Sequence, residues 1–412
     1  MLNSRAWRLL AGLVGLAPAG HAAEVAADAQ AVGAPVAGAQ AVGAPYVINV
    51  IEPMSGNAAF VGHTHEAALL VLQDHINLQG GIRGRPISLA FHDDQTTPQL
   101  AVQITNEILA SHPAVMLGSS IVAMCGAELP LLKRGPFTYC MSPGMRPPPG
   151  SYMFSIGVNT QTLIQVSFNY FRARGWTRIA SITSTDATGQ EIEQGLDAAL
   201  ALPGNAGLRL VERSRFNVSD VSVSAQMERI RAAAPQVVIA WSTGGAIANI
   251  FKGLIQAGVE APVLTTTGNM ANPVMEKFAG FLPKTLLVPS TTYIPHDGQY
   301  ALDPRVEARQ QEFFAIATAN HVPIDYMAAG VWDSLLMITD ALRTLGPEAS
   351  AEQVRAWLAG QTAWAGMNGL YDFTKVPQRG LDAGQAIITR WDAAGARWRS
   401  VSTPGGEQAL PE

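Results

Sequence analysis

The chain has 412 residues, of which 48% are apolar and 14% charged, and its net charge is −5. This composition can bury two cores of ordinary domain size, so two domains are expected. The chain is acidic and lacks any extended run of Lys or Arg, whereas a nucleic-acid-binding protein carries a basic surface. Nucleic acid is therefore excluded as a partner.

The N-terminus has the pattern of a secretory signal peptide. Arg5 and Arg8 precede the apolar run 9–17 and the small-residue segment APAGHAA. A membrane-spanning helix needs about 20 apolar residues, which is more than this run offers. Cleavage could follow Ala19 or Ala22, and no cysteine follows the run to carry a lipid. We expect residues 1–23 to be removed and the mature protein to be periplasmic, not a lipoprotein.

A repetitive segment follows the signal sequence. AQAVGAP occurs at 29–35 and again at 39–45, within a stretch made almost wholly of Ala, Gly, Val, Pro and Gln. Such a composition buries too little apolar surface to offset the entropy lost on ordering the chain. Residues 24–45 are therefore predicted to be disordered.

From residue 46 onward, short β-rich runs alternate with longer helical ones. The first series predicts strands at 46–51, 86–92, 114–117 and 137–141, with helices at 57–79, 98–111 and 122–133. The second predicts helices at 161–174, 189–202, 222–234 and 245–258, with strands at 178–183, 208–215, 237–241 and 262–265. The remainder predicts a strand at 286–288, helices within 303–346 and at 351–359, and strands within 369–399. This alternation is typical of α/β folds, so we predict two Rossmann-like lobes with parallel central sheets.

Only two cysteines occur, Cys125 and Cys140, at the two ends of a predicted helix-to-strand unit. An oxidising compartment permits them to pair. The sequence does not give their separation, so both a disulfide and two buried thiols are compatible with it.

Small and polar residues follow several predicted strands. In open parallel sheets, ligands bind beyond the carboxyl ends of the strands, where helices begin with unpaired N–H groups. In EPMSGNAAFVG at 52–62, Ser55 and Asn57 could cap the next helix, and Gly56 permits either a tight turn or a close approach to a ligand. Similar junctions are GSSI at 118–121, MSPGMRP at 141–147, TSTDATG at 183–189, WSTGG at 241–245 and TTTGN at 265–269. We expect these junctions to converge on one crevice.

Several motifs resemble those of the periplasmic solute-binding proteins of ABC transporters, of the branched-chain amino-acid type with the type I fold. They are PMSGNAAFVG, INLQGGIRGRPISLAFHDDQTTPQLAV at 76–102, MSPG at 141–144, STGG at 242–245 followed by IQAGV, and GLYDFTK at 369–375. The resemblance spans residues 46 to 399.

This resemblance implies a discontinuous domain arrangement. Lobe 1 would hold 46–157 and 290–370, and lobe 2 would hold 158–289 and 371–399, with a tail at 400–412. The chain would cross between the lobes near Gly157, Ser290 and Gly369. The resemblance also implies a monomer without a cofactor that closes on a small solute and delivers it to a membrane permease.

Candidate ligand contacts come from the strand ends and from the resemblance. They are Phe60, Ser119, Ser120, Val122, Ser142, Met145, Arg146, Asp186, Trp241, Thr243, Gly244 and Thr267.

Some of these positions depart from the pattern of the amino-acid-binding relatives. Val122 stands where a hydroxyl residue is usual, and Met145 and Arg146 replace Ala-Thr. Thr267 replaces an acidic residue, and Thr188 replaces an aromatic one. The departures imply that the negative charge that would pair with an α-ammonium group is absent.

A desolvated ammonium group needs such a compensating charge. Arg146 could instead bind a carboxylate through two hydrogen bonds, which favours an organic or aromatic acid as the solute. A solvated Arg146 and an ammonium partner at Asp186 remain the alternatives. Trp241 could stack on an aromatic solute.

Enzymatic and metal-binding motifs are weak. His63 and His65 lie two apart on a predicted helix, so their side chains point in different directions and do not chelate one ion. Asp93 and Asp94 precede Pro98, where helix capping explains them better than acid–base pairing. No nucleophile elbow, phosphate loop or dinucleotide fingerprint occurs. We expect no enzymatic activity, and the alternative to transport is a periplasmic ligand sensor that feeds a signalling partner.

Overall fold

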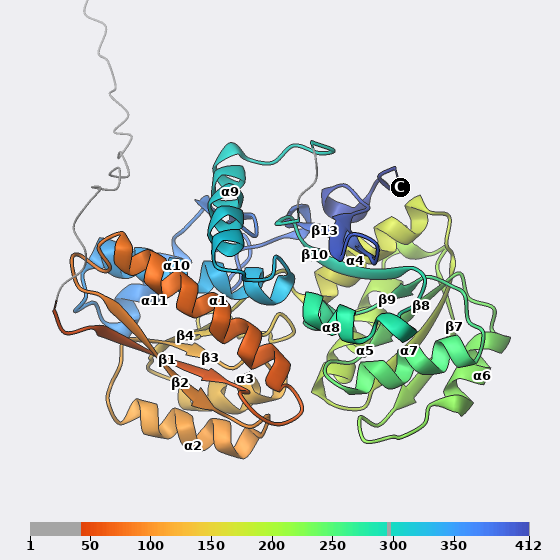
Figure 1. The fold of residues 1–412 in the computed structure, drawn as a ribbon, viewed down its shortest axis with the longest axis horizontal. Helices are drawn as coiled ribbons and strands as arrows, with labels where there is room; N and C mark the ends of the chain where they lie inside the picture. Colours follow the sequence, from red (N-terminus) through yellow and green to blue (C-terminus); the bar gives the residue numbers. More distant parts are fainter. Residues whose placement is uncertain (1–42, 295–297, 412) are drawn as a thin grey trace, which may run out of the picture. The chain divides into compact units, whose positions relative to one another are not determined.

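The computed structural model describes residues 43–294 and 298–411. The predicted signal peptide and residues 24–42 of the predicted disordered segment lie outside the described residues. The strands form two large sheets and one two-stranded sheet (Figure 1).

The first sheet has the order β2-β1-β3-β4-β5 and is parallel throughout. Its strands are β1 Tyr46–Glu52, β2 Ile87–Asp93, β3 Val115–Gly118, β4 Phe137–Cys140 and β5 Met153–Ser155. Every residue of β3, β4 and β5 is buried, as expected for parallel strands covered on both faces. The four strands predicted in this region are confirmed, and β5 is an addition.

The second sheet has the order β14-β13-β10-β9-β8-β6-β7. Its strands are β6 Arg178–Ser184, β7 Arg209–Phe216, β8 Val237–Trp241, β9 Val263–Leu264, β10 Leu286–Thr291, β13 Ala386–Asp392 and β14 Arg397–Ser400. Strands β6 to β10 are parallel, while β13 pairs antiparallel with β10 and with β14. The predicted α/β class with parallel central sheets is confirmed.

The helices connect successive strands and continue beyond β10. They are α1 Ala59–Leu78, α2 Pro98–Leu109, α3 Val122–Glu128, α4 Thr160–Ala173, α5 Ala187–Leu200, α6 Ser224–Ala232, α7 Ala246–Gln256, α8 Asn272–Lys277, α9 Pro304–Ala319, α10 Tyr326–Leu345 and α11 Ala351–Ala359. Helix α10 is buried along most of its length and lies beside α1 (Figure 1). The small sheet pairs β11 Trp364–Ala365 with β12 Leu370–Tyr371.

Residues 303–346 form two helices with a break between them. Pro323 disfavours helical backbone at the residue before it. Asp325 then caps α10, accepting a hydrogen bond from the Ala328 N–H at 3.1 Å. The break sets the start of α10, and with it the position of Tyr326.

The loops after β1 and β2 hold each other through Asp93. Its carboxylate accepts the Met54 and Ser55 N–H groups and the Ser55 hydroxyl, at 2.6–3.1 Å. Helix α1 has no side-chain cap, and Thr97 precedes α2, so the predicted capping roles of Ser55, Asn57, Asp93 and Asp94 are wrong.

Gly56 also serves the contact between these two loops. Its φ is +80°, and a Cβ atom there would lie 2.5 Å from the Gln95 carbonyl oxygen. The glycine is therefore required by a close approach of one loop to the other.

The segment after β12 stays with the first sheet. The Ser155 N–H donates to the Gln378 carbonyl at 3.0 Å, and the buried Arg379 donates to the Ile156 carbonyl at 2.5 Å. Residues 371–380, expected in lobe 2 after a crossing near Gly369, therefore lie against β5. Residues beyond Ser400 pack on the second sheet's helix α4, where the Asn169 side chain donates to the Gly405 carbonyl.

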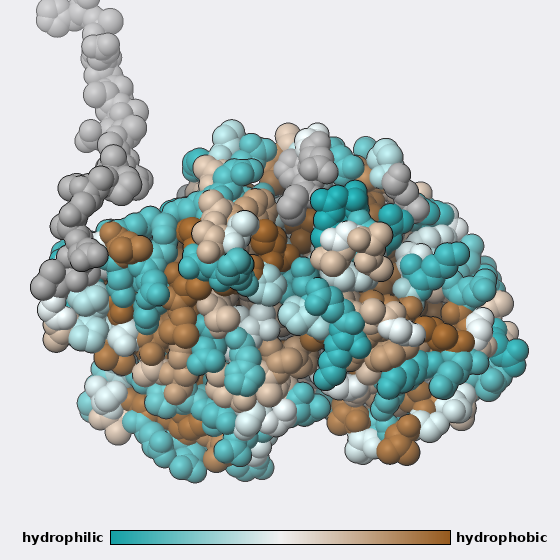
Figure 2. Space-filling model, viewed as in Figure 1, coloured by the Kyte–Doolittle hydropathy of each residue, from teal (hydrophilic) through white to brown (hydrophobic). Residues whose placement is uncertain are grey.

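The surface drawn in Figure 2 carries hydrophobic residues in small groups among hydrophilic ones, as is usual for folded proteins. Among residues 43–294 and 298–411, no helix is both long and apolar enough to span a bilayer.

The two cysteines form a disulfide between α3 and the end of β4. Their Cα atoms are 6.0 Å apart, and both residues belong to a small buried cluster with Ile51, Met116 and Met153. This settles the choice that the sequence left open.

We predict that the disulfide stabilises the fold. It joins residues 15 positions apart, and this constraint on the unfolded chain is worth about 3 kcal/mol. Reduction should lower the thermal midpoint by several degrees. The C125A/C140A variant should melt near the reduced protein and should not respond to reductant. An unchanged midpoint after reduction, with both thiols then reactive in denaturant, would show that the bridge is not stabilising.

Candidate ligand-binding site

A cavity of about 50 Å³ lies where the ends of both sheets meet, enough for roughly three to five water molecules. On the side of the first sheet it is lined by Val61, His65, Ser120, Ile121, Val122, Met141, Ser142, Pro143, Gly144 and Ile156. On the side of the second sheet it is lined by Thr160, Thr188, Trp241, Thr243, Thr266 and Gly268, and from α10 by Tyr326 and Met327. Each of the six predicted strand-end junctions supplies at least one lining residue, including Val61 from the junction after β1 and Thr188 from the one after β6.

The lining combines hydroxyl groups with apolar surface. Among the described residues that line it, none carries a carboxylate, an ammonium or a guanidinium group. A solute here would meet hydroxyls, one imidazole and the faces of apolar side chains. This set suits a small, largely apolar molecule with one or two polar groups.

Five of the predicted contact residues line the cavity: Ser120, Val122, Ser142, Trp241 and Thr243. The other seven, Phe60, Ser119, Met145, Arg146, Asp186, Gly244 and Thr267, are not among the lining residues.

Most of the second group have other contacts. Ser119 donates to Asp94 at 2.6 Å, and Met145 belongs to the cluster around the disulfide. Asp186 caps α5 by accepting the Gly189 N–H at 3.0 Å. A Cβ atom on Gly244 would lie 3.3 Å from the Asn57 side chain, so the β8–α7 junction closely approaches the loop after β1.

Arg146 lies outside the cavity and pairs with Glu191 of α5. Its Nε and a terminal guanidinium nitrogen donate to one Glu191 oxygen at 3.1 and 2.9 Å. Burial raises the pKa of Glu191, while a hydrogen bond from Thr160 and the charge of Arg146 act to lower it. The predicted two-pronged contact of Arg146 is therefore made to a carboxylate on α5, and not inside the cavity.

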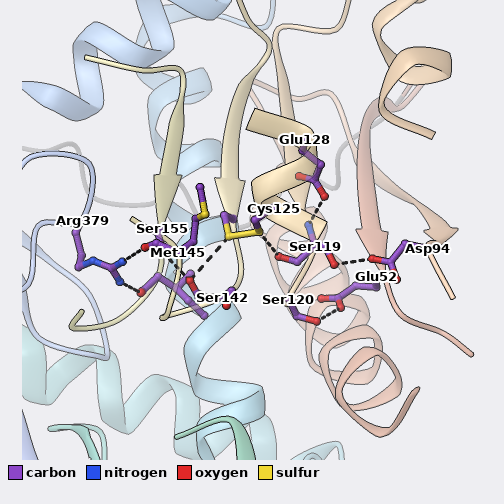
Figure 3. The surroundings of a disulfide bond; sticks show 12 residues. Glu52, Asp94, Ser119, Ser120, Cys125, Glu128, Ser142, Met145, Ser155 and Arg379 are labelled. Carbon is purple, nitrogen blue, oxygen red and sulfur yellow. Dashed lines mark hydrogen bonds between the residues drawn. A yellow bond between two sulfur atoms is a disulfide. The ribbon is translucent and has the colours of Figure 1, made fainter. Parts of the chain in front are cut away.

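Three buried carboxyl groups lie directly behind the Ser119–Ser120 turn (Figure 3). Glu52 accepts the Ser120 hydroxyl at 2.7 Å, and Asp94 accepts that of Ser119. Glu128 accepts the Ser119 N–H at 3.1 Å. The carboxyl groups therefore fix both serines of the β3–α3 junction from behind.

Burial raises the pKa of Glu128 to about 8. The hydrogen bond from the Ser119 N–H acts to lower this pKa, and the nearby charges of Asp94 and Glu52 act to raise it. Burial likewise raises the pKa of Asp94, mainly opposed by the Ser119 hydroxyl. Glu128 therefore keeps its proton at neutral pH.

Sequence reasoning missed most of the lining from α1 and α10. His65 is 2% exposed, and Tyr326 is equally enclosed. Asp325, next to Tyr326, is fully buried, and burial raises its pKa to about 6. Among the described residues, no group of three or more metal-ligating side chains is positioned to hold a metal ion.

We predict that Glu128→Gln changes the pH dependence of stability. The unfolded carboxyl ionises near 4.5 and the folded one near 8, so the wild type loses stability as pH rises through this window. The full loss is on the order of 5 kcal/mol. The variant lacks this ionisation, so it should match the wild type near pH 5 and exceed it at pH 9.

Urea denaturation at pH 5, 7 and 9 measures this difference. Glu260→Gln, at an exposed position, is the matched control and should follow the wild type at each pH. Parallel profiles for wild type and Glu128→Gln would contradict the assigned protonation.

Comparison with known proteins places the chain in a family. Residues 45–396 match the family model described as periplasmic binding protein. Among curated proteins, none matches the chain significantly.

Solved structures share the fold at low sequence identity. An extracellular ligand-binding receptor from Rhodopseudomonas palustris HaA2 is 20% identical, with a TM-score of 0.72 over 86% of this chain and 99% of that one. The branched-chain amino acid transporter substrate-binding protein LivJ from Streptococcus pneumoniae, in complex with isoleucine, is 14% identical, with a TM-score of 0.72 over 87% and 99%. An ABC transporter solute-binding protein from R. palustris, in complex with benzoate, is 17% identical, with a TM-score of 0.71 over 90% and 98%.

At these identities the structures show the fold, whereas the family model covers most of the chain. The chain belongs to the periplasmic binding protein family, whose members bind ligands and are not enzymes.

Proposed function

We propose that the chain is the exported substrate-binding component of an ABC importer that captures a small organic solute and delivers it to a membrane permease. The observation that carries this proposal is the hydroxyl-rich cavity at the strand ends of both sheets. A solute held there touches both lobes at once, so its binding favours the arrangement in which they meet.

A solute that contacts both lobes gives them a physical reason to close. A micromolar solute supplies about 8 kcal/mol of binding free energy. Contacts available only when both lobes line the cavity shift the population toward the closed form. A permease that recognises the closed form would then receive loaded protein.

The two lobes of the proposal each surround one large sheet. Lobe 1 comprises 46–157 with 290–370, to which the segment 371–380 is added, and lobe 2 comprises 158–289 with the strands after 385. We infer that the protein acts as a periplasmic monomer after removal of its signal peptide. Its permease and ATPase partners follow from the kinship with transporter components.

A periplasmic sensor is the second candidate, because one similar structure is described as an extracellular ligand-binding receptor. A sensor would bind its solute in the same cavity but pass the signal to another protein. Deleting the gene distinguishes the two, since loss of solute uptake supports transport and loss of a response with uptake intact supports sensing.

The solute is proposed to be a small organic or aromatic carboxylate. The similar structures were solved with isoleucine and with benzoate, which share a carboxylate and an apolar body. Trp241, Ile121 and Val122 supply apolar surface in the cavity, and the hydroxyl groups supply hydrogen bonds. No lining carboxylate is described that could neutralise an α-ammonium group.

Thermal shift measurements with leucine, 4-methylpentanoate, benzoate and benzamide test this proposal. We expect one of the two simple acids to raise the melting temperature most, with compaction detected by small-angle scattering. Strong stabilisation by leucine without any by 4-methylpentanoate would show that the ammonium group is recognised and would overturn the preference for simple acids.

Arg146→Ala provides a separate prediction. Because Arg146 pairs with Glu191 outside the cavity, the variant should change the affinity for a bound acid by less than about threefold. Calorimetric titration measures the affinity. A loss of a hundredfold or more would mean that Arg146 turns into the cavity when the acid binds.

A further inference from the structure

His65 is the one imidazole that lines the cavity among the described residues. It projects from α1 and is 2% exposed. Its Nδ1 atom lies 2.7 Å from one oxygen of Glu52, and the other oxygen of Glu52 accepts the Ser120 hydroxyl, also at 2.7 Å. Glu52 on β1 thus connects two residues that line the cavity, His65 and Ser120.

The burial of Glu52 constrains the charge of this chain. Glu52 has no exposure to water, and an ionised carboxylate in such a place requires an opposite charge. Of the two side chains described in contact with it, only His65 can carry one. We infer that His65 supplies this charge, as an imidazolium whose Nδ1 faces the Glu52 carboxylate.

The remaining ring nitrogen then becomes available to a solute. An imidazolium donates from both nitrogens, and Nδ1 is taken by Glu52. No hydrogen bond of Nε2 is found among the described residues. Because His65 lines the cavity, an acceptor on a bound solute can take this second donor.

We propose that the Nε2–H of His65 binds the carboxylate of the solute, with Glu52 positioning the ring through Nδ1. This inference rests on the proposed function and names the residue that selects an acid. It also replaces Arg146 in that role. The Ser120 hydroxyl donates to the other oxygen of Glu52 and so helps to fix the Glu52 carboxylate in position.

The pairing predicts a direction of pH dependence. When the ring loses one proton, the short contact with Glu52 keeps the other on Nδ1, so Nε2 becomes an acceptor and no longer binds an anion. Binding of an acid through Nε2–H should therefore weaken once the ring has lost that proton. A cationic solute would show the opposite trend, because a neutral ring accepts from an ammonium group.

Other titratable groups near His65 must be separated from this effect. Asp325, which caps α10, interacts electrostatically with His65, and burial raises its own pKa to about 6. Tyr326 lies next to it, and burial raises its pKa further above the range of interest. On the side of the second lobe, the cavity is lined by threonines, Trp241 and Gly268, which do not titrate.

The test is calorimetric titration of the full mature protein with benzoate and 4-methylpentanoate at pH 6 and 8.5. His65→Gln should weaken binding of the acid roughly 10- to 100-fold at pH 6 and should flatten the pH dependence. His63→Gln is the matched control, since His63 is exposed on the same helix and pairs with Glu66 at 3.6 Å. Asp325→Asn should keep the pH dependence that His65 causes.

If His65→Gln alone does not fold, the double variant E52Q/H65Q removes the buried charge together with its partner and serves in its place. An acid that binds equally to wild type and variant, or more tightly at pH 8.5, overturns the role of His65 and leaves the proposed function standing. Binding of neither acid, at either pH, overturns both.

Discussion

The constraint on which the site depends is the common direction of the strands. In a parallel sheet all strands end at one edge. Residues that follow the buried strands there can face a ligand while they stay attached to the sheet. The ends of β3 and β4 in one sheet and of β8 and β9 in the other supply Ser120, Ser142, Thr243 and Thr266 to the same cavity. Each hydroxyl lies close to a buried strand and is therefore fixed in position by the sheet.

Buried carboxyl groups hold the serines of the β3–α3 junction in position. Glu52, Asp94 and Glu128 each accept a hydrogen bond from the Ser119–Ser120 turn (Figure 3). Their mutual repulsion and burial keep the pKa of Glu128 high, which limits the net charge of the cluster. The cavity lining itself holds no carboxylate, so these groups position the serine hydroxyls without adding a negative charge to the cavity surface.

The sequence was sufficient to predict the helices and strands, but it was insufficient to predict which side chains pair with one another. Strand positions and sheet class follow from local apolar runs, and the polar strand ends follow from where those runs stop. The partners of Arg146 and Ser119 lie 45 and 25 positions away, on other elements, so no local pattern identifies them. Arg146 was therefore assigned by its chemistry alone, and the structure gives it a carboxylate of the protein.

His65 is a different case, because a sequence signal for it existed. The buried face of α1 includes Val61, Ala68, Leu69, Leu72 and Ile76, a helical repeat in which position 65 falls on the same stripe. His63 falls outside it and is exposed. The helical period that argues against a shared metal ion therefore also separates the two histidines into one buried and one solvated residue.

Part of the backbone that lines the cavity is also held by a buried arginine from a distant part of the chain. Arg379, in the segment after β12, is buried and donates to the carbonyl groups of Met145, Ile156 and Gly157, so it fixes the backbone around Gly157. Gly157 has a φ of +65°, and any Cβ atom there would collide with the Tyr326 hydroxyl. Ile156 and Tyr326 both line the cavity. In the proposed two-lobe arrangement the chain crosses near Gly157, so a solute that packs against these two side chains would act directly on that crossing.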